Sequence, residues 1–361
     1  MKRITTREIL DFYDNTLRKT VKNKDKLIKF EMNKSLYVNY IVDVLNGDKP
    51  LKHYYNIFLI YEPKPRLIMS LNMVDKIINH YFTETVLVPK LDKKMDDRNV
   101  ATRKGKGSSC AIRLVRKYIE YYKRNKKSCY ILKIDISKFF YSIDHEVLKK
   151  MLIEDLDSDE YAFCSKIIDS TNYDYINDKI NRILERNTSV SLPYYEYSKG
   201  LPIGNLSSQC LSVYYLNRLD HYMVHDLHLK HYVRYMDDFL IFHEDKEYLE
   251  KCRDIIIDKL INEYKLNINY KKTSISNLNN GFSFLGYRFF IKKNKTIMII
   301  RKESLNNINH KVKRNNYLYK NGRITFEKFF SSSVNYLYTY KCGKVKLRRI
   351  INNSLNNVES Y

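Results

Sequence analysis

The feature that most constrains this chain is a pair of acidic residues enclosed by apolar ones. Residues 233–242 read Val-Arg-Tyr-Met-Asp-Asp-Phe-Leu-Ile-Phe. The aromatic and β-branched residues on both sides favour two strands, with Met236, Asp237 and Asp238 as the tight turn of a hairpin. Burying two carboxylates there is costly unless a cation neutralises them, and hard divalent ions prefer oxygen ligands. The pattern therefore predicts a metal site on a hairpin, and the alternative is a solvent-exposed acidic turn.

The composition points to a polyanionic partner. The 361 residues include 65 Lys and Arg against 41 Asp and Glu, which gives a formal net charge of +24. Nucleic acid is the first candidate for such a partner. A membrane surface is the second, but the sequence has no run near the roughly 20 apolar residues of a spanning helix, and its start lacks the apolar core of a signal peptide. We therefore expect a cytoplasmic protein without a membrane partner, built from about two or three subdomains.

The cysteines carry no visible chemistry. The six of them lie far apart in the sequence, with no Cys-x-x-Cys pair and no Cys/His cluster. This spacing argues against a zinc site and against a disulfide framework, so we expect reduced core residues.

Two segments concentrate the positive charge. Residues 101–128 hold ten Lys or Arg against one acid, Glu120, and are expected to form a flexible loop at 103–107 followed by an amphipathic helix. Residues 301–361 hold 13 Lys or Arg against three Glu and are expected to form about two or three helices around an aromatic cluster. Each segment is either a solvated basic face or a contact surface for phosphates.

The hydrophobic spacing predicts the remaining elements. Helices are expected over residues 1–46, with Leu36 on an apolar face, and over 71–83 and 246–262. A buried strand over 129–136 ends in Asp135, another strand is expected over 266–274, and 282–289 has the pattern of a hairpin arm. Two prolines in 61–69 favour an extended turn that presents Lys64 and Arg66 before a strand. His145 is expected on the surface at the start of a helix.

The order of the acids along the chain suggests a reaction. Asp135 ends one strand, and Asp237 and Asp238 lie on a hairpin about a hundred residues later, after a Gly-Pro-Gly turn and a helix. Two divalent ions roughly 4 Å apart can activate a 3′-hydroxyl and stabilise a leaving pyrophosphate, and they need carboxylates from neighbouring strands. A palm-type polymerase supplies its carboxylates in this order.

With these residues in place, the chain resembles reverse transcriptases over about residues 50–345. Tyr235 to Asp238 is similar to their catalytic hairpin, Asp135 with Phe139 and Phe140 to the first acidic motif, and Lys272-Thr273 to a later motif whose lysine is catalytic. The resemblance implies a magnesium site in which Asp135 and Asp237 bridge two ions, the Ile136 carbonyl joins them, and Asp238 supports the second ion. Mn²⁺ is the alternative ion.

The same resemblance implies the substrate contacts. Lys64, Arg66 and Arg103 fall where the fingers of the family bind the triphosphate and the template. Residues expected around the deoxynucleotide also include Ile136, Phe140 as a steric gate against a ribose 2′-hydroxyl, Ile203, Gly204 and Gln209. Phe284, Leu285, Gly286 and Tyr287 are similar to the family's primer grip.

The segment around Ile203 departs from the common form of the family. Many members have Gln-Gly followed by Ser-Pro, whereas this chain has Ile203-Gly204 and Ser208-Gln209. That pattern is similar to the enzymes of diversity-generating retroelements and to short bacterial reverse transcriptases of abortive-infection and antiphage defence. Two other functions are open: an RNA-dependent RNA polymerase, which also has a palm, and a non-catalytic RNA-binding scaffold.

The fold we expect is an α/β right hand with three parts. N-terminal helices and fingers span residues 1–128, a palm of antiparallel sheet with helices on one face spans 129–292, and a basic helical thumb spans 293–361. The expected partners are a template RNA, with a cognate non-coding RNA as the first choice, a primer or cDNA strand, and deoxynucleoside triphosphates. A further expected partner is an accessory protein or a second copy of the chain.

Overall fold

The computed structural model describes residues 3–61 and 64–356. Glu62 and Pro63 of the predicted proline turn, and the two ends of the chain, lie outside these residues. The chain divides into a first unit of residues 1–114, 132–242 and 246–274, and a second unit of 115–131, 243–245 and 275–361. The predicted boundaries of fingers, palm and thumb stay a prediction.

Helices open the first unit, as the sequence pattern predicts. Val38, Ile41 and Val44 are buried on one face of the third helix, at a spacing of three. Leu36 is 68% exposed because two residues of a helix turn it to the face opposite Val38, so its predicted apolar contact is wrong. The helices are α1 (Thr6–Phe12), continued by a π-helical turn (Tyr13–Leu17) and a 3-10 turn (Arg18–Thr20), α2 (Lys24–Met32) and α3 (Lys34–Leu45).

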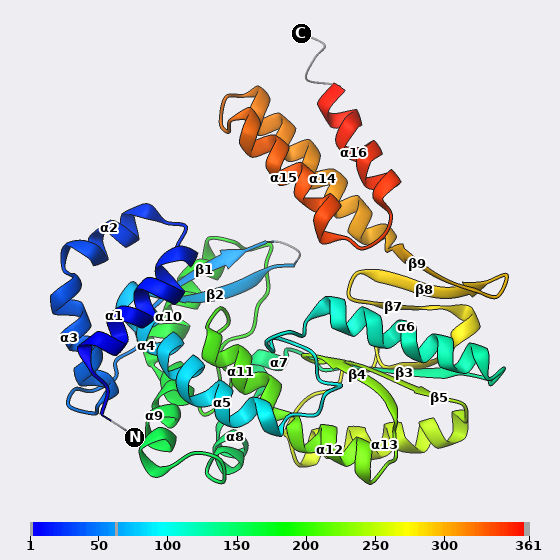
Figure 1. Ribbon diagram of the computed structural model, residues 1–361, viewed down its shortest axis with the longest axis horizontal. Helices are drawn as coiled ribbons and strands as arrows, with labels where there is room; N and C mark the ends of the chain where they lie inside the picture. The colour runs from blue at the N-terminus through cyan, green and yellow to red at the C-terminus, as the bar shows by residue number, and fades with distance from the viewer. Residues whose placement is uncertain (1–2, 62–63, 357–361) are drawn as a thin grey trace. The chain divides into compact units, whose positions relative to one another are not determined.

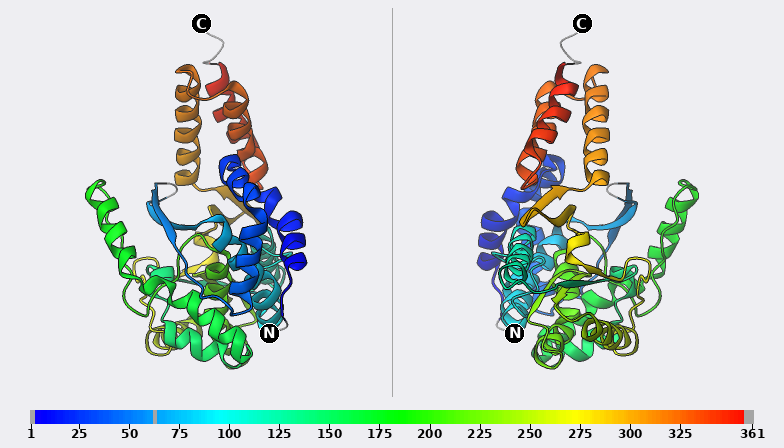
Figure 2. Two further views of the ribbon diagram at one scale, coloured as in Figure 1. Left: turned by 90° about the vertical axis from the view of Figure 1, so that its left-hand side faces the viewer. Right: turned by 90° about the vertical axis from the view of Figure 1, so that its right-hand side faces the viewer.

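An antiparallel hairpin follows, and its first strand is one that the sequence analysis missed. β1 (Tyr55–Ile60) pairs with β2 (Arg66–Leu71), with Tyr55 opposite Leu71. Its buried residues pack against α10 (Asp174–Glu185), and Ile176 and Ile180 supply the helix side of that core. Figure 2 shows α10 beside the hairpin. Arg66 is therefore the first residue of β2 rather than a residue before it.

After β2 the chain is helical, as predicted for residues 71–83. Asn72 caps the first of these helices by accepting a hydrogen bond from the Asp75 N–H. The helical elements from here to α9 are α4 (Met73–Phe82), a π-helical turn (Thr83–Leu87), α5 (Val88–Leu91), a 3-10 turn (Asp92–Lys94), α6 (Ser108–Arg124), α7 (Phe139–Ser142), α8 (His145–Leu152) and α9 (Ser158–Ile168).

Within the first unit the central strands adjoin in the order β4-β5-β3, where β3 is Tyr130–Asp135, β4 is His231–Tyr235 and β5 is Asp238–His243. Four consecutive residues of β5 are buried, which explains its uninterrupted apolar run. Two helices, α12 (Asn217–His225) and α13 (Lys246–Asn262), lie on one side of these strands in Figure 1, and α11 (Leu206–Tyr215) precedes them. The bounds of α13 match the predicted helix.

The strand predicted over 266–274 is wrong. Only Ile268 is bridged there, to Ile136, and the strand β6 begins at Ser274 and ends at Asn277. The N–H groups of Lys272 and Thr273 both donate to the Asn269 carbonyl, so residues 269–273 form a turn instead. The residue types favour a strand locally, but this turn places Asn269 and Lys272 beside Asp135.

The second unit contains a sheet and three helices that pack on one another. The antiparallel order is β7-β8-β9, with β7 (Phe282–Phe284), β8 (Tyr287–Lys292) and β9 (Lys295–Ile300), and β9 falls where the helical thumb was expected to begin. The helices α14 (Lys302–Lys320), α15 (Phe326–Thr339) and α16 (Lys344–Asn356) lie side by side.

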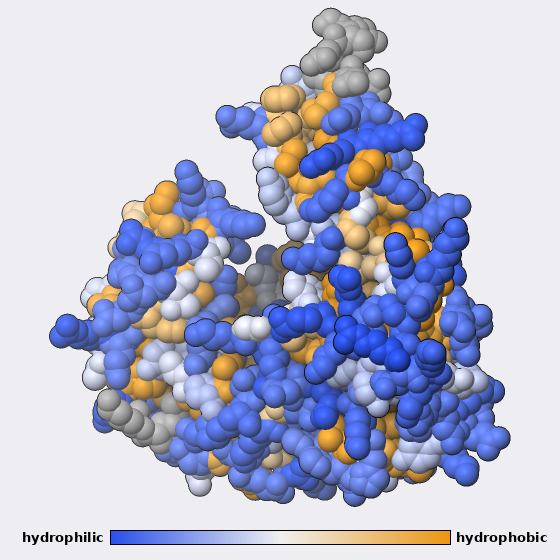
Figure 3. All heavy atoms as spheres, turned by 45° about the vertical axis from the view of Figure 1, so that its right-hand side comes forward, coloured by the Kyte–Doolittle hydropathy of each residue, from blue (hydrophilic) through white to orange (hydrophobic). Residues whose placement is uncertain are grey.

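The aromatic cluster predicted in this helical segment is only partly buried. Phe329 is buried, whereas Phe326 and Phe330 are exposed. Orange residues interrupt the hydrophilic surface of these helices in Figure 3. Nowhere in the described ranges does a helix combine the length and the apolar composition that crossing a membrane requires.

Candidate active site

The acidic pair lies on a two-residue hairpin. Tyr235 is opposite Asp238 in the register of β4 and β5, so Met236 and Asp237 form the turn and Asp238 is already the first residue of β5. Met236 has a φ of +58°, a left-handed conformation that side chains other than glycine adopt only at a cost. The predicted hairpin is confirmed, with a turn one residue shorter than expected.

Asp135 ends β3 and is held from the 269–273 turn. Asn269 donates from its backbone N–H to the Asp135 carbonyl at 2.9 Å and from Nδ2 to Oδ1 at 2.9 Å. The Lys272 ammonium lies 3.2 Å from Asp135 Oδ1 and 3.3 Å from Oδ2. The structure therefore brings together two predicted site residues, Asp135 and Lys272, and adds Asn269, which the sequence analysis did not select.

The three carboxylates share one electrostatic field. Burial raises the pKa of Asp237, and the charge of Asp135 raises it further, while Arg66 and Lys272 oppose the shift. Burial also raises the pKa of Asp238 to about 6, with Lys133 opposing and with Asp237 and Asp135 adding to the shift. Crowded, buried carboxylates of this kind are stabilised by a cation.

Two lysines supply positive charge to these carboxylates. The Lys133 ammonium lies 3.1 Å from Asp238 Oδ1, and Lys272 occupies the same role at Asp135. Lys133 and Asp135 are two residues apart and share a face of β3, so the period of a strand is a signal that could have identified Lys133.

The donor set fits a hard divalent cation in chemistry, since the three carboxylates offer only oxygen ligands. Within residues 3–61 and 64–356, however, no group of three or more His, Cys, Asp or Glu side chains is close enough to hold a metal ion. Ile136 is buried and bridged to Ile268 beside Asp135. The assignment of Asp135, Ile136, Asp237 and Asp238 as ligands stays a prediction.

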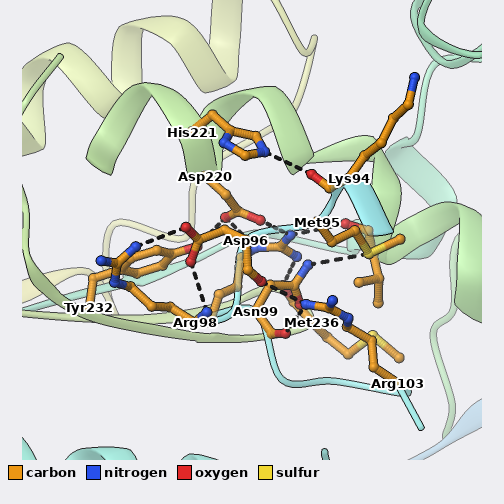
Figure 4. Close-up of polar contacts among 12 residues, drawn as sticks. Lys94, Met95, Asp96, Arg98, Asn99, Arg103, Asp220, His221, Tyr232 and Met236 are labelled. Atoms are coloured by element: carbon orange, nitrogen blue, oxygen red, sulfur yellow. Dashed lines mark hydrogen bonds and ion pairs between the residues drawn. The ribbon is translucent and has the colours of Figure 1, made fainter. Parts of the chain in front are cut away.

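A buried ion pair contacts the turn, and Figure 4 shows one partner, Asp220, with Tyr232 and Met236. Arg234 and Asp220 are both fully buried and form a salt bridge in which the Arg234 Nε donates to Asp220 Oδ1 at 2.8 Å. Tyr232 donates its hydroxyl to the same carboxylate. Burial lowers the pKa of Arg234, but the charge of Asp220 outweighs it and keeps the guanidinium protonated.

The same guanidinium joins the turn to a helix. Arg234 Nη1 donates to the Met236 carbonyl at 3.0 Å, and Nη2 donates to the Val213 carbonyl of α11 at 2.9 Å. The backbone of Arg234 also pairs with residues 98–100, since its N–H donates to the Arg98 carbonyl and its carbonyl accepts from Val100. Arg234 is a charged residue inside an apolar strand. That pattern is the sequence signal for these contacts, and the sequence analysis did not select it.

Arg103 corrects a prediction. Its side chain is 7% exposed, and its guanidinium contacts Asp92 Oδ1 at 2.5 Å, the Asp92 carbonyl at 2.9 Å, the Asp96 carbonyl at 2.6 Å and the Asn99 carbonyl at 3.0 Å. The second N–H of Arg103 Nη2 donates to Asp92 Oδ2 at 3.5 Å, so all five N–H groups of the guanidinium have an acceptor. Arg103 therefore stabilises the 92–103 segment seen in Figure 4 and has no donor left for a triphosphate.

The segment that contains Ile203 contacts two other predicted regions. The Ile203 carbonyl accepts from the Met69 N–H of β2 at 2.8 Å, and the Leu201 N–H donates to the Phe140 carbonyl at 2.7 Å. Gly204 has a φ of +114°, and a Cβ there would lie 3.0 Å from Ile68 Cγ2, so only glycine fits without strain. Phe140 and Ile203 are both half-buried, and Gln209 lies in the first turns of α11.

His145 is another correction. It is fully buried, its Nε2 lies 2.8 Å from the Gly200 carbonyl, and its Nδ1 lies 3.2 Å from Asp169 Oδ1. The sequence pattern suggested a surface position because His145 begins a helix. Its ring instead links α8 to the 200–204 segment.

The remaining predicted contacts are local features of each unit. Lys64 and Arg66 lie at the exposed end of the β1–β2 hairpin. Phe284, Leu285, Gly286 and Tyr287 form the β7–β8 turn of the second unit, where Leu285 and Gly286 have φ of +46° and +83°. The Gly286 carbonyl accepts from the Arg301 N–H at 3.0 Å, which ties this turn to the start of α14.

Comparison with known proteins identifies the fold family. The model of the family described as Reverse transcriptase (RNA-dependent DNA polymerase) matches residues 60–289, well over half of the chain. No curated protein matches the sequence. The matched residues include the hairpin, Asp135, Lys272 and the β7–β8 turn, so the predicted α/β polymerase fold is confirmed.

Solved structures similar to the chain include telomerases. Apo telomerase from Candida tropicalis, truncated from its C-terminal domain, has 17% sequence identity and a TM-score of 0.44, and the match covers 68% of this chain and 55% of that one. Telomerase from Candida albicans in complex with a TWJ fragment of telomeric RNA has 15% identity and a TM-score of 0.49, covering 86% and 55%. The chain spans about half the length of the structures it matches.

Proposed function

Because the chain belongs to the reverse transcriptase family, we propose that it is an RNA-directed DNA polymerase that extends a primer on a template RNA with deoxynucleoside triphosphates. The observation that carries this proposal is the electrostatic coupling of Asp135, Asp237 and Asp238: the charge of Asp135 raises the pKa of Asp237, and the charges of Asp135 and Asp237 both raise the pKa of Asp238. Such a site is costly to maintain without a cationic ligand.

In the proposed reaction the carboxylates of Asp135, Asp237 and Asp238 hold two Mg²⁺ ions, with Mn²⁺ as the alternative. When bound, these ions would lower the pKa of the primer 3′-hydroxyl and offset the charge on the leaving pyrophosphate. Lys272 is half-exposed beside Asp135, so its ammonium can turn toward a phosphate when the carboxylate has another partner. Arg66 supplies further positive charge near Asp237.

The proposed specificity for deoxynucleotides depends on Phe140. Its ring lies at the start of α7, five residues after Asp135, and its backbone is fixed to Leu201. An RNA-dependent RNA polymerase is the second candidate, and it would have no use for a bulky side chain there. A non-catalytic scaffold is disfavoured because it would have no reason to gather the three carboxylates.

We further propose that the template is a cognate non-coding or element-encoded RNA of a bacterial retroelement or antiphage defence system. Ile203 in place of the common glutamine supports this branch, because it leaves only dispersion contacts to an incoming nucleotide. Sequencing the nucleic acid that copurifies with the protein tests the template assignment, and recovery of only random cellular RNA would contradict it.

The test of the activity is primer extension on a defined RNA template. Asp237→Ala and Asp238→Ala should each lower the extension rate by roughly three orders of magnitude or more, since lost metal stabilisation is worth several kcal/mol. RNA affinity should change little, because these side chains hold ions rather than the core. Extension by either folded variant at the wild-type rate would refute the proposal.

A further inference from the structure

A groove of the first unit is lined by α2, α3, the segment that leads into β1 and the start of α4. Its volume is about 880 Å³, within the range of ligand sites. Its described lining residues all lie between 26 and 75, and none of them belongs to the residues predicted to bind the ions, the nucleotide or the primer. The groove is therefore a binding surface formed by residues other than those of the acidic site.

α3 contributes a face that the described chain leaves uncovered. Leu36, Tyr40 and Asp43 are spaced by four and three residues, so they share one side of the helix, and all of them line the groove. Val38 and Ile41 are buried on the opposite side. Leu36 is 68% exposed because its side of α3 faces the groove rather than the core.

Tyrosine rings line the groove and continue beyond it. Tyr54 lines the groove, is 59% exposed, and stacks on Tyr175 of α10 with ring centroids 5.2 Å apart and an angle of 17° between the rings. Tyr175 stacks in turn on Tyr173, at 6.0 Å and 20°, and Tyr173 is 43% exposed. The Lys179 ammonium lies 3.9 Å from the centroid of the Tyr54 ring. Exposed aromatic rings with lysines beside them are the kind of surface on which single-stranded nucleic acids stack their bases.

The groove is also basic. Four positions of the described lining are lysines: Lys26, Lys29, Lys49 and Lys52. Lys49 pairs with Asp43 at 2.8 Å. The second acid in the described part of the lining, Asp75, is buried and accepts hydrogen bonds from Asn72 Nδ2 at 2.7 Å and from the Tyr54 N–H at 3.4 Å. Both acids therefore have donors within the protein, and the three exposed lysines at 26, 29 and 52 favour an anionic occupant.

A single strand of nucleic acid fits these features better than a protein does. A second copy of the chain would bring a further formal charge of +24 to a basic surface. An acidic helix would suit the lysines, but it carries no flat groups to match the exposed tyrosine rings. Each nucleotide of a single strand brings one flat base and one phosphate, and so uses both. A duplex keeps its bases stacked on one another, so the strand must be single.

We propose that this tyrosine–lysine groove holds a single-stranded segment of RNA, with bases stacked on Tyr40 and Tyr54 and phosphates bound by Lys26, Lys29 and Lys52. The choice of RNA rests on the proposed function, in which the template is RNA, whereas the single-strand site rests on the groove. RNA bound here would stay attached to the protein while a different segment of it is copied at the acidic site.

The first experiment measures the affinity of the full chain for a fluorescein-labelled oligouridine RNA of about 12 nucleotides, by fluorescence anisotropy at several salt concentrations. Lys26, Lys29 and Lys52 changed together to Gln should flatten the slope of log affinity against log salt by about 2, because each neutralised phosphate contributes about 0.7.

The matched control changes Lys19, Lys22 and Lys24 together to Gln. These lysines are exposed in the same part of the chain but do not line the groove, so the slope should stay within about 0.7 of the wild-type value. Thermal unfolding verifies that both variants fold. Equal slopes in the groove variant and the control variant would overturn the site.

The second experiment separates a stacked base from an apolar contact. Tyr40→Leu and Tyr54→Leu should each weaken RNA affinity roughly fivefold or more, because leucine keeps an apolar side chain but has no flat face for a base. Tyr197→Leu is the control, since Tyr197 is 82% exposed and does not line the groove. Tyr40→Leu suffices if Tyr54→Leu, which loses the hydrogen bond between Lys179 and the Tyr54 hydroxyl, does not fold. Wild-type RNA affinity in the folded tyrosine variants would overturn the proposal and leave an acidic protein segment as the occupant.

The third experiment tests the choice of RNA. An oligodeoxyuridine of the same length should bind roughly twofold or more weakly, because Asn39 and Asn56 place exposed amides in the groove that can pair with a ribose 2′-hydroxyl. Equal affinity for both oligonucleotides would overturn the assignment to RNA.

The primer-extension assay distinguishes this proposal from the proposed function. A chain that extends primers, but whose RNA affinity does not change with the lysine and tyrosine variants, would overturn the groove and leave the polymerase standing. The expected losses of RNA affinity in a chain that does not polymerise would overturn the proposed function and leave the groove standing.

Discussion

Two of the three carboxylates in the acidic site have a lysine as their counter-charge. Lys133 pairs with Asp238 and Lys272 with Asp135, whereas Arg66 and Lys272 act on Asp237 of the turn at longer range. In the proposed reaction, a divalent cation would compete with these two lysines for the carboxylates. In that reaction, the ions would compete with Lys272 for Asp135 and free its ammonium for a phosphate of the substrate.

The steric role of Phe140 can be tested with one substitution. Phe140→Ala should admit ribonucleotides, because the ring is proposed to fill the space that a 2′-hydroxyl needs. The measurement compares incorporation of deoxy- and ribonucleotides on one RNA template, with Phe139→Leu as the control for packing in α7. A variant that loses deoxynucleotide activity and gains none with ribonucleotides would show that Phe140 is only a core residue.

His53 should make the stability of the protein depend on pH. It is 4% exposed, neither ring nitrogen has a partner among the described residues, and burial lowers its pKa to about 4. The pKa in the unfolded chain is about 6.5, so the unfolded state binds the proton first and stability is lost as the pH falls from about 6.5 toward 4.

His53→Leu should remove this dependence. Between pH 7 and pH 5 the wild type should lose about 2 kcal/mol more free energy of unfolding than the variant, measured by urea denaturation. His310→Gln, at an exposed position of α14, serves as the control. An identical loss in the wild type and His53→Leu would mean that His53 keeps its ordinary pKa.

At the scale of elements, the hairpin that carries Asp237 and Asp238 is held by Arg234. This one side chain connects β4, the Met236 carbonyl of the turn, α11 through Val213 and α12 through Asp220. The parallel bridge of Asn99 to Arg234 also covers an edge of β4. The left-handed Met236 is therefore kept in place by tertiary contacts rather than by its own preference.

Replacing the buried pair by apolar residues should separate positioning from stability. Asp220→Leu combined with Arg234→Met should leave the free energy of unfolding within about 2 kcal/mol of wild type, since apolar replacements of buried ion pairs are often tolerated. The kcat of primer extension should fall on the order of 100-fold, because the turn loses its donor and small misplacements of catalytic groups are costly.

The control for this double variant is Arg98→Met. Arg98 pairs with Asp96 at 2.8 Å and its side chain does not reach the turn. Asp220→Asn alone should destabilise the fold by about 3–5 kcal/mol, because Arg234 would stay buried without its counter-charge. A stable double variant with wild-type kcat would show that the Asp220–Arg234 pair does not position the hairpin.

For the whole molecule, the formal net charge of +24 should govern RNA binding. Binding through phosphates releases counterions, so log affinity should fall with log salt by about 0.7 per phosphate neutralised on a single strand, to a slope of about −3 or steeper. Fluorescence anisotropy with a labelled RNA between low and physiological salt measures this slope.

Neutralising the basic residues of α16 tests the contribution of this helix. Lys344, Lys346, Arg348 and Arg349 changed together to Gln should flatten the slope, and the same change at the four basic residues of α13, Lys246, Lys251, Arg253 and Lys259, should not. An affinity that hardly varies with salt would exclude phosphate contacts as the reason for the positive charge.

The sequence by itself determined the elements whose signal is local. The hairpin follows from apolar runs on both sides of a short acidic turn, and α13 from a spacing of three and four over its whole length. The order of Asp135, the glycine turn and Asp237-Asp238 also sufficed for the fold family, because each motif is a short segment with its own residue types.

Only the tertiary structure decided which side chains face one another. The donors of Arg103 all bind Asp92 and backbone carbonyls, and the ring of His145 is buried against the Gly200 carbonyl. Residues 269–273 form a turn beside Asp135 rather than a strand. These outcomes depend on packing between segments that are distant in the sequence, where burial and unsatisfied donors outweigh local preference. The contact of Asn79 on α4 with Ser207 at the start of α11 has the same origin, since these two helices meet only in the folded chain.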